Sequence, residues 1–300
     1  MFPSPLQRLE HIEFDRNKIN VFIKRDDLIH PHVSGNKWRK LKYNLEQAKA
    51  QGSSSLLTFG GAYSNHIYSC AAAAKVNNFS SIGIIRGDDL EVVNPTLSFA
   101  VSQGMQLHFV SRSEYRNRNS EDYLKDLKKK FPGAFMIPEG GSNRYAIDGV
   151  KELVSELNVA VDFLLTPVGT SGTISGLLEG MRNEGKVIGV SALKGIAFDR
   201  DIKSWSGFTN YEVWSDYHFG GYAKVTQELL DFVMWFRNTF SIALDPVYTS
   251  KMAFAFWNRL KSFPANSNIV LLHTGGLQGW NGMIERGLVH KSFVNEIIGA

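Results

Sequence analysis

Two lysines lie near the start of one predicted helix, where an amine could do chemistry. Lys37 follows Gly35 and Asn36, and Lys40 lies three residues later, so both share one helical face. The positive end of the helix dipole favours the neutral form of a lysine amine. A neutral amine is the nucleophile that bonds an aldehyde or ketone carbon. Lys37 is therefore a candidate for covalent catalysis, although an isolated lysine is usually a solvated surface residue.

A glycine-rich loop at residues 166–173 joins a predicted strand to a predicted helix and could bind an anion. Gly169 and Gly172 permit close backbone approach, and a helix N-terminus offers free N–H groups. Three hydroxyl side chains add further donors, and these are Thr170, Ser171 and Thr173. The loop lacks both the Walker pattern and the Gly-x-Ser-x-Gly pattern of a serine nucleophile. We interpret it as a phosphate cradle; the alternative is a glycine turn with a Ser/Thr cap.

A second strand-to-helix junction, residues 59–66, carries three polar side chains that could meet a substrate. They are Ser64, Asn65 and His66. In one interpretation the backbone amides here bind a carboxylate and leave the side chains for catalysis. In the other, Ser64 or Asn65 is an ordinary helix cap.

These loops belong to a regular alternation of apolar strand-length runs and amphipathic helix-length stretches. The predicted strands are 21–24, 55–59, 81–85, 106–110, 134–137, 163–166, 187–190, 212–214 and 269–272. The predicted helices are 36–51, 64–75, 95–103, 120–131, 146–157, 171–181, 223–240, 250–263 and 278–287. Alternation of this kind predicts an α/β fold with mostly parallel sheets. Nine strands are many for one sheet in 300 residues, so we expect two sheets in two domains.

Composition excludes several classes of function. Lys and Arg number 33 against 29 Asp and Glu, and a net charge of +4 is too small to indicate nucleic-acid binding. We find no apolar run of membrane-spanning length and no secretory leader, so no membrane partner is expected. Cys70 is the single cysteine, which favours a reducing, cytoplasmic setting. No metal site is predicted, because His30 and His32 lack carboxylate or cysteine partners at ligand spacing. The polar stretch 112–130 is interpreted as a solvated loop and helix face.

The lysine, the Ser-Asn junction and the phosphate cradle together fit pyridoxal 5′-phosphate, which needs an amine, ring partners and phosphate donors. With these motifs the chain resembles the D-cysteine desulfhydrase and 1-aminocyclopropane-1-carboxylate deaminase family. The matching segments occur in family order and are residues 23–27, 35–41, 60–66, 140–143, 169–173, 245–249 and 273–276.

The resemblance implies a role for each matching residue. Lys37 bonds the cofactor aldehyde, Lys40 assists the phosphate site, and Asn65 bonds the pyridoxal 3′-oxygen. Thr249 faces the pyridine nitrogen. The implied cradle residues are Gly169, Thr170, Ser171, Gly172 and Thr173. The implied catalytic residues are Lys37, Ser64, Tyr222 and Tyr248, and the implied substrate-binding residues are Ser64, Asn65 and His66.

The resemblance also implies the tryptophan-synthase-β-like fold, known as fold type II, with two open, mostly parallel twisted sheets. We expect a large domain of residues 1–45 plus 147–300 and a small domain of residues 46–146. The cofactor is expected in the cleft between them, and a homodimer is expected from the family.

The expected reaction is α,β-elimination from a small amino acid, with D-cysteine giving pyruvate, ammonia and hydrogen sulfide. Two residues favour it within the family: Thr249, where the deaminase branch carries glutamate, and His66, where that branch carries glutamine. The alternatives are a 1-aminocyclopropane-1-carboxylate deaminase giving 2-oxobutanoate and ammonia, and a non-catalytic protein that binds the cofactor. A Rossmann-like nucleotide-binding domain is disfavoured, since no early Gly-x-Gly-x-x-Gly is present. Residues 277–280 depart from the family pattern, so the resemblance does not imply which substrate side chain the site prefers.

Overall fold

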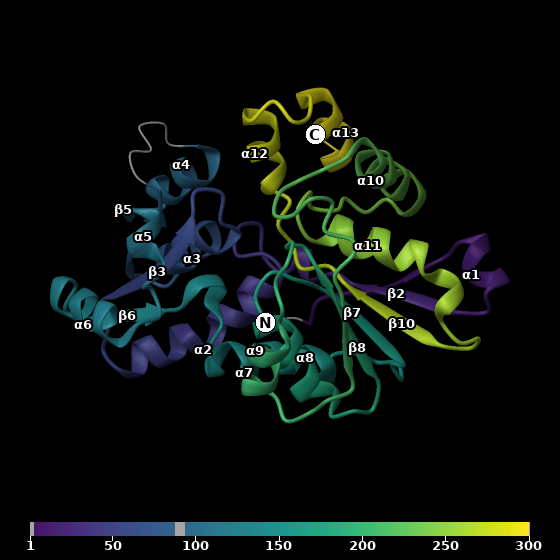
Figure 1. The fold of residues 1–300 in the computed structure, drawn as a ribbon, viewed down its shortest axis with the longest axis horizontal. Helices are drawn as coiled ribbons and strands as arrows, with labels where there is room; N and C mark the ends of the chain where they lie inside the picture. Colours follow the sequence, from purple (N-terminus) through teal and green to yellow (C-terminus); the bar gives the residue numbers. More distant parts are fainter. Residues whose placement is uncertain (1–2, 88–93, 300) are drawn as a thin grey trace.

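The computed structural model describes residues 3–87 and 94–299, and the strands among them form two sheets (Figure 1). The larger sheet has the strand order β1-β2-β10-β7-β8-β9. In that order the strands are Leu6–Leu9, Asn20–Lys24, Asn268–Leu272, Phe163–Val168, Lys186–Ser191 and Tyr211–Trp214. β1 pairs antiparallel with β2, and every other pairing is parallel.

The smaller sheet has the order β5-β4-β3-β6 and is parallel throughout. Its strands are Met105–Val110, Ser80–Arg86, Ser55–Gly61 and Ala134–Ile137. All nine predicted strands are present, so the expected α/β architecture with two mostly parallel sheets is confirmed. The additional strand, β1, was not predicted. The two sheets use separate parts of the chain, and the domain division at residues 45/46 and 146/147 stays a prediction.

The helices supply the cover that the apolar strands need. They are α1 (Ile12–Arg16), α2 (Asn36–Ala50), α3 (Asn65–Val76), α4 (Pro95–Ser102), α5 (Arg112–Tyr115), α6 (Glu121–Lys130), α7 (Arg144–Ser155), α8 (Gly172–Met181), α9 (Asp199–Trp205), α10 (Gln227–Phe240), α11 (Thr249–Asn258), α12 (Gly279–Glu285) and α13 (Lys291–Ile298). Short 3₁₀ turns lie at Asp26–Leu28, Glu139–Gly141 and Leu260–Ser262. Among the described residues, no helix combines the length and apolarity needed to cross a membrane.

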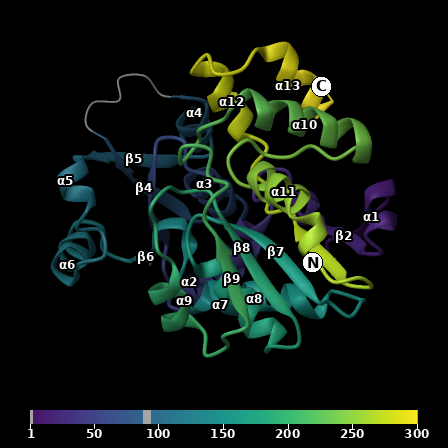
Figure 2. The same cartoon turned by 45° about the vertical axis from the view of Figure 1, so that its right-hand side comes forward.

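Successive residues of the central strands pack into different cores, as the two-residue period of a strand requires. Leu164 and Val187 pack with α8 on one face of the larger sheet. Their neighbours Leu165 and Ile188 pack with α10 and α11 on the other. Helices therefore lie on both faces of the sheet (Figure 2), which explains why these strands are apolar throughout.

Two predicted helix boundaries were wrong for local reasons. The helix predicted from residue 223 begins at Gln227, because Ala223 has a φ of 52° and Thr226 provides the N-cap. The helix predicted to residue 263 ends at Asn258 and continues as a 3₁₀ turn. Four short helices were not predicted, namely α1, α5, α9 and α13.

The carboxyl ends of three parallel strands carry the loops that the sequence singled out. β3 itself ends with Gly60 and Gly61, whereas β7 and β10 end at Val168 and Leu272 and are each followed by a glycine-containing loop. Gly35, which precedes α2, has a φ of +64° and lies so close to the 274–275 backbone that a Cβ would fall 1.8 Å from a carbonyl oxygen. Only glycine fits there, so the start of α2 lies directly against the loop after β10.

Candidate active site

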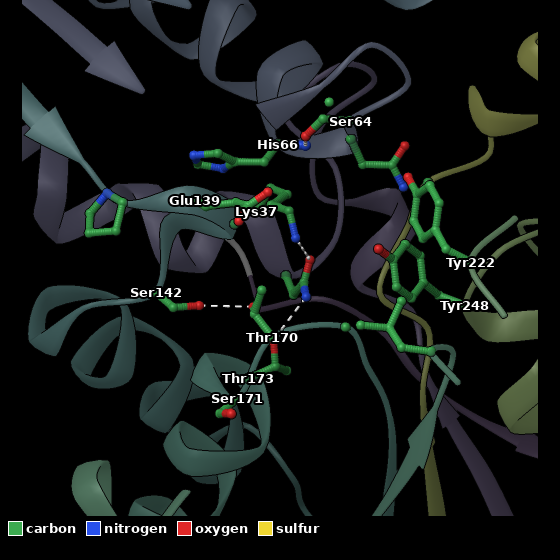
Figure 3. A pocket seen from close by; sticks show the side chains of 18 of the residues that line it. Lys37, Ser64, His66, Glu139, Ser142, Thr170, Ser171, Thr173, Tyr222 and Tyr248 are labelled. Atoms are coloured by element: carbon green, nitrogen blue, oxygen red, sulfur yellow. Dashed lines mark hydrogen bonds between the residues drawn. The ribbon is translucent and has the colours of Figure 1, made fainter. Parts of the chain in front are cut away.

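A single cavity of about 1510 Å³ brings most of the predicted site residues together. Those that line it are Lys37, Ser64, Asn65, His66, Gly169, Thr170, Ser171, Thr173, Tyr222 and Tyr248. Figure 3 shows Lys37 in the middle, the cradle residues below it, Ser64 above it and the two tyrosines to its right. Lys40, Gly172 and Thr249 do not line the cavity.

Lys37 lies in the first turn of α2, as predicted. Its Nζ donates to Asn36 Oδ1 at 3.1 Å, and Asn36 Nδ2 donates to Thr173 Oγ1 at 2.9 Å. Burial lowers the pKa of Lys37 to about 8, against the opposing pull of the Asp245 carboxylate. About one tenth of this amine is therefore neutral at pH 7, far more than for an ordinary lysine, and this fraction can act as nucleophile or base.

The cradle surrounds a buried lysine that has no acidic partner among the described residues. Lys40 is 1% exposed. Its Nζ donates at 3.2 Å to three uncharged oxygen atoms, which are Gly140 O, Ser142 Oγ and Thr170 Oγ1. Burial and the nearby Lys37 hold the pKa of Lys40 well below its ordinary value. Ser171 Oγ is buried and makes no hydrogen bond within the described chain. A buried amine without a counter-charge beside an unpaired hydroxyl suits a bound anion.

Ser64 caps α3, so the cap interpretation and the cavity position both hold. Ser64 Oγ accepts from the amides of His66 and Ile67 at 3.2 and 3.3 Å, and the Ser64 amide donates to Gly61 O at 3.0 Å. Two of the amides that we expected to bind a carboxylate are thus already paired. A carboxylate here must compete with Ser64 Oγ for the His66 amide, and the Ser64 hydroxyl hydrogen stays available as a donor.

His66 is held as a neutral imidazole with its proton on Nε2. Its Nε2 lies 2.8 Å from Thr58 Oγ1, and that hydroxyl donates its own hydrogen to Ile137 O. Thr58 must therefore accept from His66 Nε2–H. Burial, with Lys37 and Lys40 nearby, keeps the pKa of His66 well below its ordinary value. Its Nδ1 is buried without a partner in the described chain and can accept a hydrogen bond.

The unusual segment 277–280 contacts the predicted site. Gln278 Nε2 donates to Asn65 Oδ1 at 3.0 Å, which orients the Asn65 amide and leaves its Nδ2 as a donor. Gly276 makes room for that amide, since a Cβ there would lie 2.8 Å from Asn65 Nδ2. Trp280 is buried and anchors the segment by donating from Nε1 to Leu244 O. Gln278, which belongs to the segment that departs from the family pattern, therefore holds the Asn65 side chain in place.

The two predicted tyrosines meet at one wall of the cavity. The rings of Tyr222 and Tyr248 lie 6.2 Å apart between centroids, and Tyr222 Oη donates to Tyr63 O at 3.4 Å. Gly169 allows this packing, because a Cβ there would lie 2.7 Å from the Tyr248 ring. The buried Lys251 on α11 holds the loop before Tyr222, donating to the carbonyl oxygens of residues 218 and 221.

Thr249 does not line the cavity, and its hydroxyl is held by Asp245, so its predicted position opposite the ring nitrogen stays a prediction. It is fully buried at the start of α11. Its hydroxyl donates to Asp245 Oδ1 and accepts from the Asp245 amide. The Asp245 carboxylate also accepts from the amides of Val247, Tyr248 and Thr249, so it caps the helix. Thr274 does line the cavity, and it was part of a predicted motif without being given a role.

The sequence reasoning also missed a group of charged residues in the cavity. Three arginines of the supposedly solvated stretch 112–130 line it, and these are Arg112, Arg116 and Arg118. Arg86 and Arg286 line it as well. The only sequence feature that pointed to Arg112, Arg116 and Arg118 was the high arginine content of a polar stretch, and such a stretch is typical of a protein surface. Among the described residues, no cluster of His, Cys, Asp and Glu side chains could hold a metal ion.

Comparison with known proteins gives a consistent result. Residues 1–275 match the model of the family described as "Pyridoxal-phosphate dependent enzyme". A Thermotoga maritima protein named "Putative 1-aminocyclopropane-1-carboxylate deaminase" is 31% identical, covering 92% of this chain and 95% of that protein. The mitochondrial "Bifunctional D-cysteine desulfhydrase/1-aminocyclopropane-1-carboxylate deaminase" of Arabidopsis thaliana is 29% identical, and the match covers 92% of this chain and 77% of that protein. A crystal structure of an "ACC deaminase homologue" superposes with a TM-score of 0.83 at 25% identity, covering 99% of this chain and 94% of that one.

Proposed function

Because this chain belongs to the family of pyridoxal-phosphate dependent enzymes, we propose that it eliminates the β-substituent of a small amino acid, with D-cysteine as substrate. Cysteine and water would give pyruvate, ammonia and hydrogen sulfide. The observation that carries the proposal is Lys37, an amine with a pKa of about 8 in the same cavity as a phosphate-type cradle. The relatives named for D-cysteine desulfhydrase and for the deaminase support this reaction type.

The residues present fit the cofactor. The phosphate would lie at the N-terminus of α8 on Thr170, Ser171 and Thr173, where its charge would compensate the buried Lys40. The unpaired Ser171 hydroxyl is a donor that a phosphate oxygen would satisfy. When bound, the cofactor ring delocalises the electron pair left on the substrate α-carbon.

The chain's own groups would handle the substrate and its protons. Lys37 Nζ would take the α-proton, since its lowered pKa brings the neutral amine within reach of neutral pH. The α3 N-terminus would bind the substrate carboxylate, with the Ser64 hydroxyl donating to it. Asn65 Nδ2, oriented by Gln278, would bond the ring oxygen of the cofactor. Burial raises the pKa of Tyr248 well above its ordinary value, so that hydroxyl stays protonated and can donate to the leaving group.

The deaminase reaction is the second candidate, because several relatives carry that name. The choice between the two reactions rests on the uncharged residue expected opposite the ring nitrogen, Thr249, whose hydroxyl is held by Asp245 in this structure. Thr274, which lines the cavity, is likewise uncharged. An uncharged partner leaves the ring a weaker electron sink than a carboxylate would, which suits loss of a good β-leaving group.

Keto-acid release separates the candidates. Purified protein loaded with pyridoxal 5′-phosphate would be incubated with D-cysteine, L-cysteine, β-chloro-D-alanine and 1-aminocyclopropane-1-carboxylate. Pyruvate from D-cysteine and β-chloro-D-alanine supports the elimination. If 2-oxobutanoate forms from the cyclic substrate alone, the protein is the deaminase. Cofactor binding without any keto acid would leave the non-catalytic alternative.

Substitution of Gly172 should weaken cofactor binding. An alanine Cβ there would lie 2.6 Å from Ser142 Oγ and 3.1 Å from Lys40 Nζ, pushing both donors out of the cradle. Hydrogen bonds to charged groups contribute about 1.5–3 kcal/mol, so Gly172→Ala should raise the cofactor Kd about ten- to hundredfold. Equilibrium titration measures the Kd. Gly207→Ala, where a Cβ meets nothing within 4 Å, is the matched control; equal Kd values in both variants would contradict this placement.

Cofactor loading should follow the ionisation of Lys37. Only the neutral amine attacks an aldehyde, so the loading rate should rise with pH and level off above a pKa of about 8. An ordinary lysine would keep gaining rate toward 10.5. Absorbance after mixing apoprotein with the cofactor at a series of pH values gives the rate. Free hexylamine under the same conditions corrects for titration of the cofactor itself, and a rate still climbing steeply above pH 9 would refute the lowered pKa.

We also propose a cytoplasmic homodimer. The family resemblance supports the dimer, and a single buried cysteine that needs no oxidising compartment supports the location. Sedimentation of the loaded protein as a monomer at micromolar concentration would contradict the dimer.

A further inference from the structure

Five arginines from distant parts of the chain line the cavity, and we call them the arginine rim: Arg86, Arg112, Arg116, Arg118 and Arg286. Arg86 ends β4, the next three lie on or just after α5, and Arg286 directly follows α12. Among the described residues, the acidic ones in the same lining are Glu139 and Asp201. The walls are therefore strongly cationic, and a cleft lined by one sign of charge concentrates ligands of the opposite sign.

Four of these arginines have no ion pair with an acid in the described part of the chain. Only Arg118 has one, with its Nε 2.7 Å from Glu139 Oε2. Arg86 and Arg286 lie instead over aromatic rings, 5.7 Å from the Tyr115 centroid and 5.6 Å from the Tyr63 centroid. Rings hold a guanidinium group in place without neutralising it. Both side chains are thus oriented while their charge stays available.

Arg86 and Arg286 lie on the substrate side of the cavity, away from the phosphate cradle. Arg86 pairs in register with Gly61, and its Nη2 lies 3.3 Å from where a Cβ on Gly61 would be, near the start of the loop leading to Ser64. Burial raises the pKa of the Tyr222 hydroxyl, and both guanidinium groups are close enough to oppose that rise. In Figure 3, Ser64 lies above Lys37 and Tyr222 lies to its right, whereas Ser142, Thr170 and Ser171 lie below it.

The cavity is also larger than the proposed reaction needs. Pockets for drug-sized ligands measure about 300–1,000 Å³, and this one measures about 1510 Å³. Pyridoxal 5′-phosphate with a three-carbon amino acid leaves space at the rim.

We propose that the arginine rim binds an anionic β-substituent on the amino-acid substrate, such as a phosphate ester, and that the enzyme also acts on O-phosphoserine. This rests on the proposed function, whose substrate class it narrows. Lys37 takes the α-proton, the Cβ–O bond breaks, and its electron pair leaves with the phosphate. Water then releases ammonia, so that O-phosphoserine and water give pyruvate, ammonia and phosphate. Arg86 and Arg286 hold the departing anion.

Binding of an unreactive analogue tests the rim without relying on turnover. The probe is 2-amino-3-phosphonopropionate, in both enantiomers, titrated calorimetrically into the loaded enzyme beside alanine of the same configuration. The Arg86→Gln/Arg286→Gln double variant should lower the ratio of phosphonate to alanine affinity at least about tenfold. Raising the salt concentration should shrink the wild-type ratio as well. Arg144→Gln, an exposed arginine outside the cavity, should leave the ratio unchanged.

Turnover provides the second readout. The ratio of kcat/KM for O-phosphoserine to that for β-chloroalanine should fall at least about tenfold in the double variant. If pyruvate forms from β-chloroalanine while both ratios stay unchanged, the rim proposal is wrong and the elimination stands. If no amino acid gives a keto acid, the elimination fails, and the phosphonate titration still decides whether the rim binds the anion.

Discussion

Replacing Lys37 with alanine should remove activity by a factor of at least about 10⁴, because both the covalent attachment of the cofactor and the base for the α-proton are lost. The loaded variant should also lack the long-wavelength absorption of a cofactor bonded to a protein amine. Lys37 is the only lysine among the described residues that line the cavity, so no second amine is placed to substitute for it. Lys40 is committed to the oxygens of the cradle and does not line the cavity.

The control for Lys37→Ala lies on the same helix. Lys49 is exposed at the far end of α2, where it donates to Asn77 Oδ1. Lys49→Ala should keep both the absorption and the turnover within about twofold of wild type, as expected of a surface substitution. A Lys37→Ala protein that still shows the absorption band, with turnover near wild type, would overturn the assignment on which the proposed function depends.

Replacing Arg39 with alanine should produce the largest loss of stability. Arg39 is 2% exposed and Asp26 is fully buried. Arg39 Nε lies 2.6 Å from Asp26 Oδ2, and Arg39 Nη1 lies 2.8 Å from Glu156 Oε1. Lys24 also pairs with Glu156, at 2.7 Å. Breaking a buried network from one side leaves uncompensated charge and costs about 3–5 kcal/mol of the free energy of unfolding, a fall of roughly 10 °C in Tm.

The network also positions the site, because Asp26 O accepts from the Gly35 amide at the start of α2. Arg39→Ala should therefore weaken cofactor binding as well as stability. Thermal unfolding and cofactor titration measure the two effects. Arg16→Ala is the control, since Arg16 pairs with Glu13 on the surface and such pairs contribute about 0–1 kcal/mol. Equal Tm changes in both variants would show that the buried network does not stabilise the fold.

Burial of Glu156 gives this network a pH signature. Desolvation alone would raise the pKa of Glu156, but hydrogen bonds from Arg39 and Lys24 hold it below its ordinary value. A carboxyl group whose pKa is depressed in the folded state stabilises the fold at pH values above its ordinary pKa of 4.5. This stabilisation is lost as the pH falls below that value. Acidification below about 4.5 should therefore narrow the Tm difference between wild type and Arg39→Ala.

The central strands of both sheets could be predicted because both of their faces are covered. Residues such as Leu164 and Leu165 are buried in different cores, so a continuous apolar run appears in the sequence. β1 (Leu6–Leu9) was missed because it is an edge strand whose middle residues, Gln7 and Arg8, are exposed. Its strand character comes from pairing with β2 and not from its own residues.

The candidate site was predictable where chemistry is local. The glycines, the hydroxyls of residues 170–173 and the Ser64 cap act within a few residues of one strand end, so their types and spacing carry the signal. Thr249 shows the limit of this reasoning. Its neighbours in sequence predict that it faces the ring nitrogen, whereas its bond to the Asp245 carboxylate four residues earlier depends on the backbone path of the turn and could not be predicted.

Local sequence by itself determined the strand-to-helix junctions, the lysine at a helix start and the alternation that yields two parallel sheets. Tertiary structure alone decided which junctions share a cavity and what else enters it. The packing of the two sheets places the loops after β3, β7 and β10 around one space, and it brings Arg86 and Arg286 into the lining of that space although 200 residues separate them. Hydrophobic period and capping act over one or two turns, whereas charge and cavity shape depend on which distant elements pack together.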